Sequence, residues 1–284
     1  MKSHYRTQAP AVAEALAGRK AWGYQVFAAL AALAAFAALP VLAASTVSPD
    51  DLSPGDLIRG ESFPAVYYYG EDGLRYVFPN DKTYSTWYED FSAVLWLSDG
   101  DLATIQIGGN VTYKPGVKML KIQSDPTVYA LSAGGILRAI ESEEVASELY
   151  GENWNEQIDD IPDGFFGNYE IGEDVEFSSQ YDVDVEEQDA LSINDDRDLH
   201  PFVEIEISAD GYSQPTITVN VGIAIRWVNE DEDTHSATEW DRVWGSGTLQ
   251  TGEHFTKYFN EAGTWHYYSK DDDRNVFEGA IIVE

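Results

Sequence analysis

The fold prediction rests on residues 215–284, PTITVNVGIAIRWVNEDEDTHSATEWDRVWGSGTLQTGEHFTKYFNEAGTWHYYSKDDDRNVFEGAIIVE. Apolar and polar residues alternate along several short runs of this stretch, and turns that contain Gly or Asn separate the runs. Such alternation is typical of strands with one buried face. A further alternating run begins at Phe202, so the pattern predicts an antiparallel β-sandwich over residues 202–284.

Single residues along this region also match a family pattern. In chain order they are Ile217-Thr218-Val219, Val221-Gly222, Trp227-Val228-Asn229, His235, Ser246-Gly247, Gly252-Glu253, Phe259, Ala262-Gly263-Thr264-Trp265, Tyr267 and Gly279. The pattern resembles that of the cupredoxins, especially the plastocyanin-like branch. The resemblance implies a Greek-key β-sandwich, which in that family holds copper through two His, one Cys and an axial Met.

The loop that ends at Gly279 carries three of the four ligand positions that the resemblance implies. In the plastocyanin-like spacing, the second His follows the Cys by three residues, the Met follows it by eight and a Gly follows it by ten. On this spacing, Ser269 stands at the Cys position, Asp272 at the second His position and Phe277 at the Met position. Only the mid-chain ligand, His235, is present.

The chain contains no cysteine, and serine supplies no thiolate at ordinary pH. Type 1 copper is therefore excluded, and no cofactor is expected. The alternative is a weak divalent-cation site that combines His235 with Asp272, because one imidazole and one carboxylate bind a metal weakly unless their geometry is well fixed. The competing interpretation places Asp272 at a solvated loop tip and makes His235 a hydrogen-bonded residue. Two further histidines, His254 and His266, are expected to point outward from their strands.

The chain begins with a basic segment that is followed by an apolar run. Together they make up residues 1–44, and the apolar run ends in small residues. Two of these last residues, Val41 and Ala43, suit the recognition positions of a signal peptidase. The pattern predicts export and therefore an extracellular or cell-surface location. Residues 21–44 are expected to be either part of a cleaved signal peptide or an uncleaved membrane anchor, because about 20 uncharged residues can span a bilayer.

Residues 53–177 contain a degenerate internal duplication, with a first repeat over 53–117 and a second over 118–177. Ser62-Phe63-Pro64-Ala65-Val66-Tyr67 recurs as Ser124-Asp125-Pro126-Thr127-Val128-Tyr129, and Leu74-Arg75 recurs as Leu137-Arg138. Each copy is expected to be a small β-rich α+β unit, with a helix over 142–150 in the second copy. The copies resemble repeats of exported bacterial proteins, and that resemblance implies no activity. The whole chain is thus predicted to be mainly β.

The aromatic residues of the two copies have two interpretations. Trp87, Tyr88 and Trp154 are most typical of the core of a small domain. The alternative is that exposed indoles stack on sugars in a carbohydrate-binding protein.

Residues 178–201 have a different composition from their surroundings. They contain eight acidic residues against one Arg, and they lack apolar periodicity. This composition predicts an acidic, solvated linker and a domain boundary.

The chain is strongly acidic, with 50 Asp and Glu against 17 Lys and Arg and a formal net charge of −33. Such a charge repels nucleic acid and anionic lipid surfaces, so nucleic-acid binding is excluded and membrane contact is expected only through the N-terminal segment. The acidity favours solubility in salty surroundings over specific binding of divalent cations, because no cluster has the ligand spacing of a calcium loop.

No nucleophile, base and orienting residue form a recognisable group in the sequence, and no phosphate-binding glycine loop occurs. The leading prediction is therefore a non-catalytic exported protein whose repeats and copper-less sandwich serve as structural or binding modules. Edge strands of the sandwich are the expected sites for a surface partner or for self-association. The alternative is a metal-binding protein, for copper handling or redox chemistry, with a non-blue site around His235.

Overall fold

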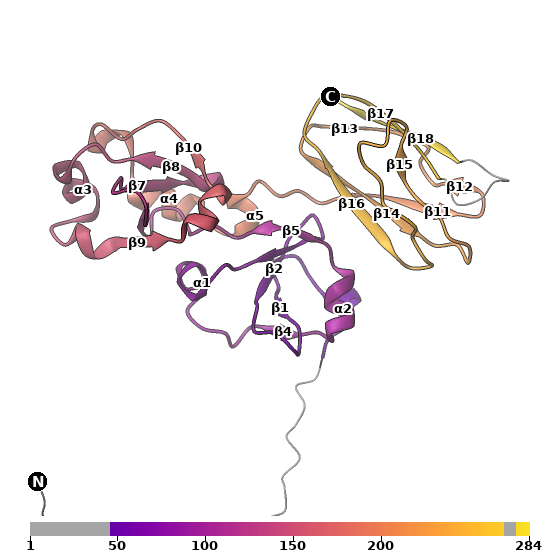
Figure 1. Ribbon diagram of the computed structural model, residues 1–284, viewed down its shortest axis with the longest axis horizontal. Helices are drawn as coiled ribbons and strands as arrows, with labels where there is room; N and C mark the ends of the chain where they lie inside the picture. Colours follow the sequence, from indigo (N-terminus) through magenta and orange to yellow (C-terminus); the bar gives the residue numbers. More distant parts are fainter. Residues whose placement is uncertain (1–45, 270–276) are drawn as a thin grey trace, which may run out of the picture. The chain divides into compact units, whose positions relative to one another are not determined.

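The computed structural model describes residues 46–269 and 277–284, so the predicted signal peptide or anchor over 1–44 lies outside the described residues. Ala44–Glu284 form one compact unit. The architecture is mainly β, because the described residues contain four sheets that short helices accompany (Figure 1). None of the helices in this part of the chain is long and apolar enough to cross a membrane.

The first sheet unit, residues 57–110, has the strand order β4-β1-β2-β3-β5. Its strands are β1 (Leu57–Arg59), β2 (Tyr67–Tyr69), β3 (Arg75–Val77), β4 (Leu95–Trp96) and β5 (Ile107–Asn110). The accompanying helices are η1 (Pro49–Asp51), α1 (Asp81–Trp87) and α2 (Asp99–Thr104). Asn80 begins α1 and Ser98 begins α2, because each side chain accepts a backbone N–H from the first turn.

The second sheet unit, residues 119–171, has the strand order β10-β8-β7-β6-β9. Its strands are β6 (Met119–Ile122), β7 (Tyr129–Ser132), β8 (Ile136–Ala139), β9 (Ile158–Ile161) and β10 (Glu170–Ile171). Its helices are η2 (Ala133–Gly135), α3 (Glu143–Tyr150), η3 (Trp154–Gln157) and η4 (Asp163–Asn168). The helix predicted over 142–150 is confirmed, since Ser142 caps α3 by accepting the Val145 N–H at 3.3 Å.

The two sheet units share one topology. In each, three antiparallel strands are flanked by a parallel strand on either side: β1 pairs with β4 and β3 with β5, as β6 pairs with β9 and β8 with β10. The registers correspond as well. Tyr68 lies opposite Tyr76 in the first unit, and Ala130 lies opposite Arg138 in the second. These registers match at a constant offset of 62 residues. The recurrence of Leu74-Arg75 as Leu137-Arg138 lies one residue out of this register, because Arg75 pairs with Tyr69 whereas Arg138 pairs with Ala130.

Residues 178–201, predicted to be a solvated linker, instead contain η5 (Ser178–Gln180), α4 (Val183–Asp189) and α5 (Ile193–Asp196). Ile193 is fully buried in the apolar cluster of the first sheet unit. Tyr181 is buried in a cluster of the second unit. The prediction failed because a few apolar residues at irregular spacing anchor this acidic segment, and such anchors leave no periodic signal.

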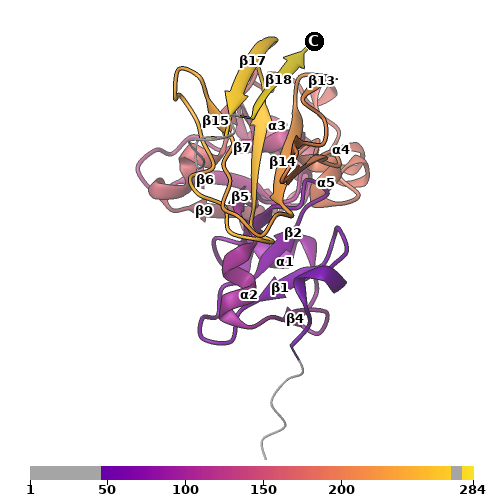
Figure 2. The same cartoon turned by 90° about the vertical axis from the view of Figure 1, so that its right-hand side faces the viewer.

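Residues 203–283 form a β-sandwich of two four-stranded sheets, which faces the viewer in Figure 2. Its strands are β11 (Val203–Ser208), β12 (Gly211–Tyr212), β13 (Thr216–Val219), β14 (Ile223–Asn229), β15 (Thr238–Glu239), β16 (His254–Phe259), β17 (Gly263–Tyr268) and β18 (Glu278–Val283). The sheet orders are β12-β11-β14-β16 and β13-β18-β17-β15.

The predicted antiparallel arrangement of the sandwich is wrong for two strand pairs. Strand β11 runs parallel to β14, and β13 runs parallel to β18, so both sheets are mixed. Alternation along a strand reports which face is buried, but it does not report the direction of the neighbouring strand. That direction depends on connections between residues far apart in the chain.

Aromatic side chains fill the core of the sandwich. Trp227 of β14 is fully buried, and its ring lies 5.4 Å from that of Trp244 and 5.2 Å from that of Tyr267. Ile205 and Ile207 of β11 are also fully buried, as the alternation predicts. This core is continuous between the two sheets.

Strand β16 is an edge strand, and side chains of the first sheet unit bind to it. The Gln106 amide donates to the Thr256 carbonyl oxygen at 2.9 Å and accepts the Thr256 N–H at 3.1 Å. The buried Asp72 carboxylate accepts hydrogen bonds from the hydroxyls of Tyr76 and Tyr258. The middle of this edge is therefore already paired, as edge strands commonly are in proteins that avoid aggregation.

Candidate functional site

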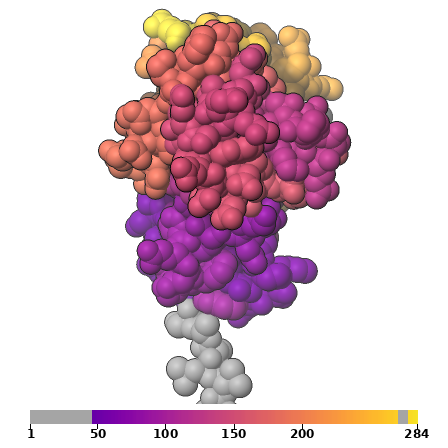
Figure 3. Space-filling view, turned by 90° about the vertical axis from the view of Figure 1, so that its left-hand side faces the viewer, coloured from indigo at the N-terminus to yellow at the C-terminus, as the bar shows by residue number. Residues whose placement is uncertain are grey.

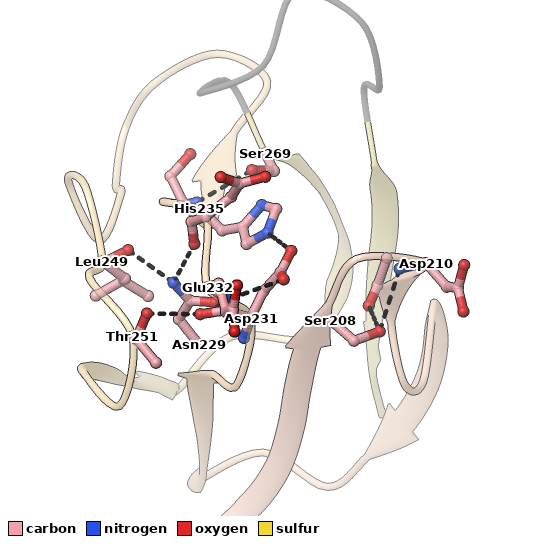
Figure 4. A network of polar contacts seen from close by, with 12 residues as sticks. Ser208, Asp210, Asn229, Asp231, Glu232, His235, Leu249, Thr251 and Ser269 are labelled. Carbon is pink, nitrogen blue, oxygen red and sulfur yellow. Dashed lines mark hydrogen bonds and ion pairs between the residues drawn. The ribbon is translucent and has the colours of Figure 1, made fainter.

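A buried amide holds the loop that follows β14. Asn229 is fully buried, and its Nδ2 donates to the carbonyl oxygens of Asp233 at 2.8 Å and Leu249 at 2.9 Å (Figure 4). Its Oδ1 accepts the Asp231 N–H at 3.0 Å. Three hydrogen bonds from one side chain thus determine the path of residues 229–235.

The substitution Asn229→Ala is expected to lower the free energy of unfolding by about 2–3 kcal/mol, since three hydrogen bonds worth roughly 1 kcal/mol each are lost. Urea denaturation followed by tryptophan fluorescence measures this loss. Thr251→Val is the matched control, because Thr251 donates a single exposed hydrogen bond to the Asp231 carbonyl oxygen at 2.7 Å. Its loss is expected to cost less than about 1 kcal/mol. Equal losses in the two variants would contradict the role of Asn229.

His235 lies at the end of this loop, and its side chain is only 6% exposed. Its backbone pairs with that of Leu249 in both directions, at 3.1 Å and 2.8 Å. Its ring Nε2 lies 2.8 Å from Asp231 Oδ2. The hydrogen bond to His235 holds the pKa of the Asp231 carboxyl below its usual value, so this carboxylate is charged at neutral pH.

The residues at the Cys and Met positions of the family spacing lie beside His235. The Ser236 N–H donates to Ser269 Oγ at 3.1 Å, and the Ser269 N–H donates to the Phe277 carbonyl oxygen at 3.0 Å. The rings of Phe277 and His235 are 5.5 Å apart. The tertiary structure thus brings together three of the predicted positions, whereas Asp272 lies outside the described residues.

The donors around His235 do not fit a type 1 copper ion. The Ser269 hydroxyl accepts a backbone N–H and supplies no thiolate, and Phe277 has no donor atom in its side chain. Over residues 46–269 and 277–284, no group of three or more His, Cys, Asp or Glu is placed to hold a metal ion. The imidazole of His235 and the carboxylate of Asp231 form a hydrogen-bonded pair, which is a weak donor set for a divalent cation.

Sequence reasoning missed Asp231 as the partner of His235. The only sequence signal was an acidic residue four positions before the histidine, and in a loop this spacing does not specify a contact. Asn229 belongs to the family-like string Trp227-Val228-Asn229, but its role depends on Leu249, which is distant in the chain. Sequence spacing alone does not show such a contact.

Both strand histidines lie on the outward faces of their strands, as predicted, but only His266 is exposed. His266 is exposed and stacks on Trp240 with ring centroids 5.0 Å apart. His254 is partly buried, and burial lowers the pKa of its imidazole. The outward face of β16 is covered in this region, since Thr256 on the same face is also buried.

Two of the three aromatic residues singled out in the sequence, Trp87 and Tyr88, lie where core residues are expected. Trp87 and Tyr88 pack against the apolar cluster of the first unit, and the Trp87 indole N–H donates to the Thr112 carbonyl oxygen at 2.9 Å. Trp154 is half-buried at the start of η3.

No family model matches the chain, and no curated protein matches it. Solved structures with similarity to part of it include cupredoxins. A purple cupredoxin from Nitrosopumilus maritimus is 26% identical, with 29% of this chain and 99% of that chain covered and a TM-score of 0.27. An amicyanin from Paracoccus versutus is 25% identical, with 29% and 81% covered and a TM-score of 0.26. A mutant amicyanin in its reduced Cu(I) form is 20% identical, with 29% and 82% covered and a TM-score of 0.27. This chain is thus similar to cupredoxins over less than a third of its length.

Proposed function

We propose that this chain is an exported, non-catalytic protein whose two sheet units and cupredoxin-like sandwich act as binding or structural modules. The observation that carries the proposal is that the side chains at three of the family's ligand positions already contact other groups of the chain. The Ser269 hydroxyl binds a backbone N–H, the Phe277 ring packs on His235, and His235 pairs with Asp231. Such a sandwich retains a framework without the thiolate on which blue-copper electron transfer depends.

Two further observations support the modular part of this proposal. The sequence recurs between residues 53–117 and 118–177, and the two sheet units have matching strand orders and registers. Duplicated units that each bury their own apolar cluster are typical of repeat proteins that present binding surfaces. The location at the cell surface rests on the basic and apolar pattern of residues 1–44.

Titration calorimetry of the full chain with Cu(II) and Zn(II) tests the absence of a copper function. We expect only weak, non-stoichiometric heats from exposed carboxylates, and we expect His235→Ala to leave them unchanged. His266→Ala is the matched control, because His266 is exposed and its ring stacks on Trp240, whereas Asp231 pairs with His235. Stoichiometric Cu(II) binding that disappears in His235→Ala but persists in His266→Ala would contradict the proposal.

That contrary outcome corresponds to the second candidate function, a metal-binding protein with a non-blue site around His235. One observation favours it: the buried imidazole of His235 already lies 2.8 Å from a carboxylate oxygen of Asp231. A metal would have to displace this hydrogen bond and recruit further donors, of which Asp272 is the one that the sequence predicts.

The structural form of the proposal includes self-assembly through unpaired strand edges. Size-exclusion chromatography with light scattering, carried out on the full chain with and without calcium, measures it directly. A monomer at every concentration in both conditions would remove self-assembly from the proposal and leave the binding role.

A further inference from the structure

The two sheet units each carry a surface groove at the same place in their topology. The first groove, about 670 Å³, lies beside β2, and the second, about 390 Å³, lies beside β7. In the first, the Phe78 N–H donates to the Val66 carbonyl oxygen at 3.0 Å. In the second, the Ile140 N–H donates to the Val128 carbonyl oxygen at 2.9 Å. All four residues line their groove and lie just outside one end of a strand pair, β2 with β3 or β7 with β8, so equivalent positions form both floors (the second unit faces the viewer in Figure 3). Phe165 of the second unit also lines the first groove.

Each groove also reaches the beginning of a helix. Asn80 and Asp81 line the first groove at the start of α1, and Ser142 and Glu143 line the second at the start of α3. The side chains of Asp81 and Glu143 are both exposed. Within the described part of the chain, neither carboxylate makes a hydrogen bond or an ion pair. Both grooves therefore have an unpaired negative charge at an equivalent position.

An aromatic side chain also lines each groove. In the first, Phe91 stacks on Tyr84 with ring centroids 4.2 Å apart, yet 53% of Phe91 is exposed. In the second, Trp154 takes the sequence position of Phe91, and the smaller Ala146 takes that of Tyr84. Phe63 adds a further exposed ring, 72% accessible, to the first groove. Exposed apolar surface of this kind marks interaction sites.

The remaining polar side chains of the first groove already have partners. Arg59 donates to the carbonyl oxygens of Gly60 and Phe63, at 3.3 Å and 3.2 Å. The Asn110 amide donates to Asn168 Oδ1 at 2.9 Å. A sugar needs several hydrogen-bonding groups around an aromatic face, and few are free in this groove. Apolar side chains suit its walls. A cation suits the Asp81 carboxylate, because the positive charge of Arg59 is held by two carbonyl oxygens and by the Trp96 ring at 4.1 Å. The net charge of −33 attracts such a cation over a longer range.

We propose that the two grooves are matched docking sites for a basic, proline-containing segment of a partner polypeptide. Its proline and apolar residues cover the aromatic wall, as proline-rich segments do in aromatic-lined grooves. Its Lys or Arg pairs with Asp81 in one groove or Glu143 in the other. The inference rests on the proposed binding role of the sheet units and names the chemistry of their partner. Two grooves on one chain permit bivalent capture of a segment that is long enough to reach both.

Fluorescence anisotropy of the full chain with a labelled peptide of repeated Lys-Pro-Leu units tests the proposal. We expect this peptide to bind at two equivalent sites, and we expect a Glu-Pro-Leu peptide and a labelled cello-oligosaccharide not to bind. The double variant Asp81→Lys with Glu143→Lys is expected to weaken binding of the peptide about tenfold or more. In this variant, a lysine in each groove repels the basic residues of the peptide instead of attracting them. Each single variant is expected to leave one site intact.

The matched control is Glu170→Lys with Glu204→Lys, which changes the net charge equally at exposed positions that line neither groove. We expect it to change the dissociation constant less than about twofold. Equal weakening by both double variants would overturn the proposal, because it would show non-specific attraction. Binding of the oligosaccharide or of the Glu peptide would also overturn it, as would a dimer that the groove variant dissociates. Each of these failures leaves the calorimetric and light-scattering tests of the proposed function unaffected.

Discussion

Replacing Trp227 by alanine is expected to lower the free energy of unfolding of the sandwich by about 3–5 kcal/mol. The side chain is fully buried between the two sheets, and its ring lies within 5.4 Å of Trp244 and 6.0 Å of Phe255. Its removal leaves a cavity that the neighbouring rings of Phe255 and Tyr267 cannot fill, because β16 and β17 hold them in place. Urea denaturation monitored by near-ultraviolet circular dichroism measures the loss.

Trp240→Ala is the matched control for Trp227→Ala. Trp240 is 53% exposed, and its main ring contact is the stack on His266. We expect a loss below about 1 kcal/mol, since an exposed aromatic pair contributes little. If the two variants lost similar amounts, the aromatic core would not be the feature that stabilises the sandwich.

The second large effect is a pH dependence that originates at Asp196 of α5. This carboxyl group is 4% exposed, and burial raises its pKa from the ordinary 3.8 to about 6. Hydrogen bonds from the Gly134 N–H at 3.0 Å and the Thr112 hydroxyl at 3.3 Å act in the opposite direction. Arg197 also lowers this pKa, and Glu186 raises it.

The raised pKa of Asp196 determines the sign of the effect. The contribution of Asp196 to the free energy of unfolding is fully present below the pKa of 3.8 that this group has in the unfolded chain. It is lost as the pH rises through the folded-state pKa of about 6. Between pH 4 and pH 7.5 the loss amounts to about 2–3 kcal/mol. Asp196→Asn does not titrate, so its stability relative to the unchanged chain is expected to rise by this amount over the same interval. Urea denaturation at several pH values measures the difference.

Asp195→Asn is the matched control for this titration, because it removes the same charge from the neighbouring position. The Asp195 side chain is exposed and accepts a hydrogen bond from the Ser192 hydroxyl at 2.6 Å. We expect its stability relative to the unchanged chain to vary by less than about 0.5 kcal/mol between pH 4 and pH 7.5. A variation of the same size in both variants would contradict the assignment to Asp196.

Local patterns predicted much of the sandwich but not its pairing. The alternation in β11 correctly indicates that Ile205 and Ile207 are buried, because a strand exposes every second side chain to the same face. The parallel pairing of β11 with β14 was not predicted, because Val203 meets Ile225 only through the tertiary arrangement. The helix over 142–150 was predicted from its sequence pattern, and Ser142 caps it through a local hydrogen bond.

The candidate site shows the same division. The family resemblance placed Ser269 and Phe277 near His235. In the structure, Ser269 accepts a hydrogen bond from the neighbouring Ser236, and the Phe277 ring lies 5.5 Å from that of His235. Asp231 was not predicted, because its contact with His235 depends on a loop conformation that Asn229 holds. A buried amide of this kind acts through backbone groups, whose positions a sequence does not display.

The sequence by itself determined that no thiolate exists in this chain, that the chain is acidic, and where its strands and turns alternate. These properties follow from composition and from neighbours along the chain. Only the tertiary structure decided the direction of the paired strands, the burial of Ile193 and Asp196, and the shared position of the two grooves. Each of these depends on contacts between residues that are distant in sequence, and such contacts form only when the sheets pack.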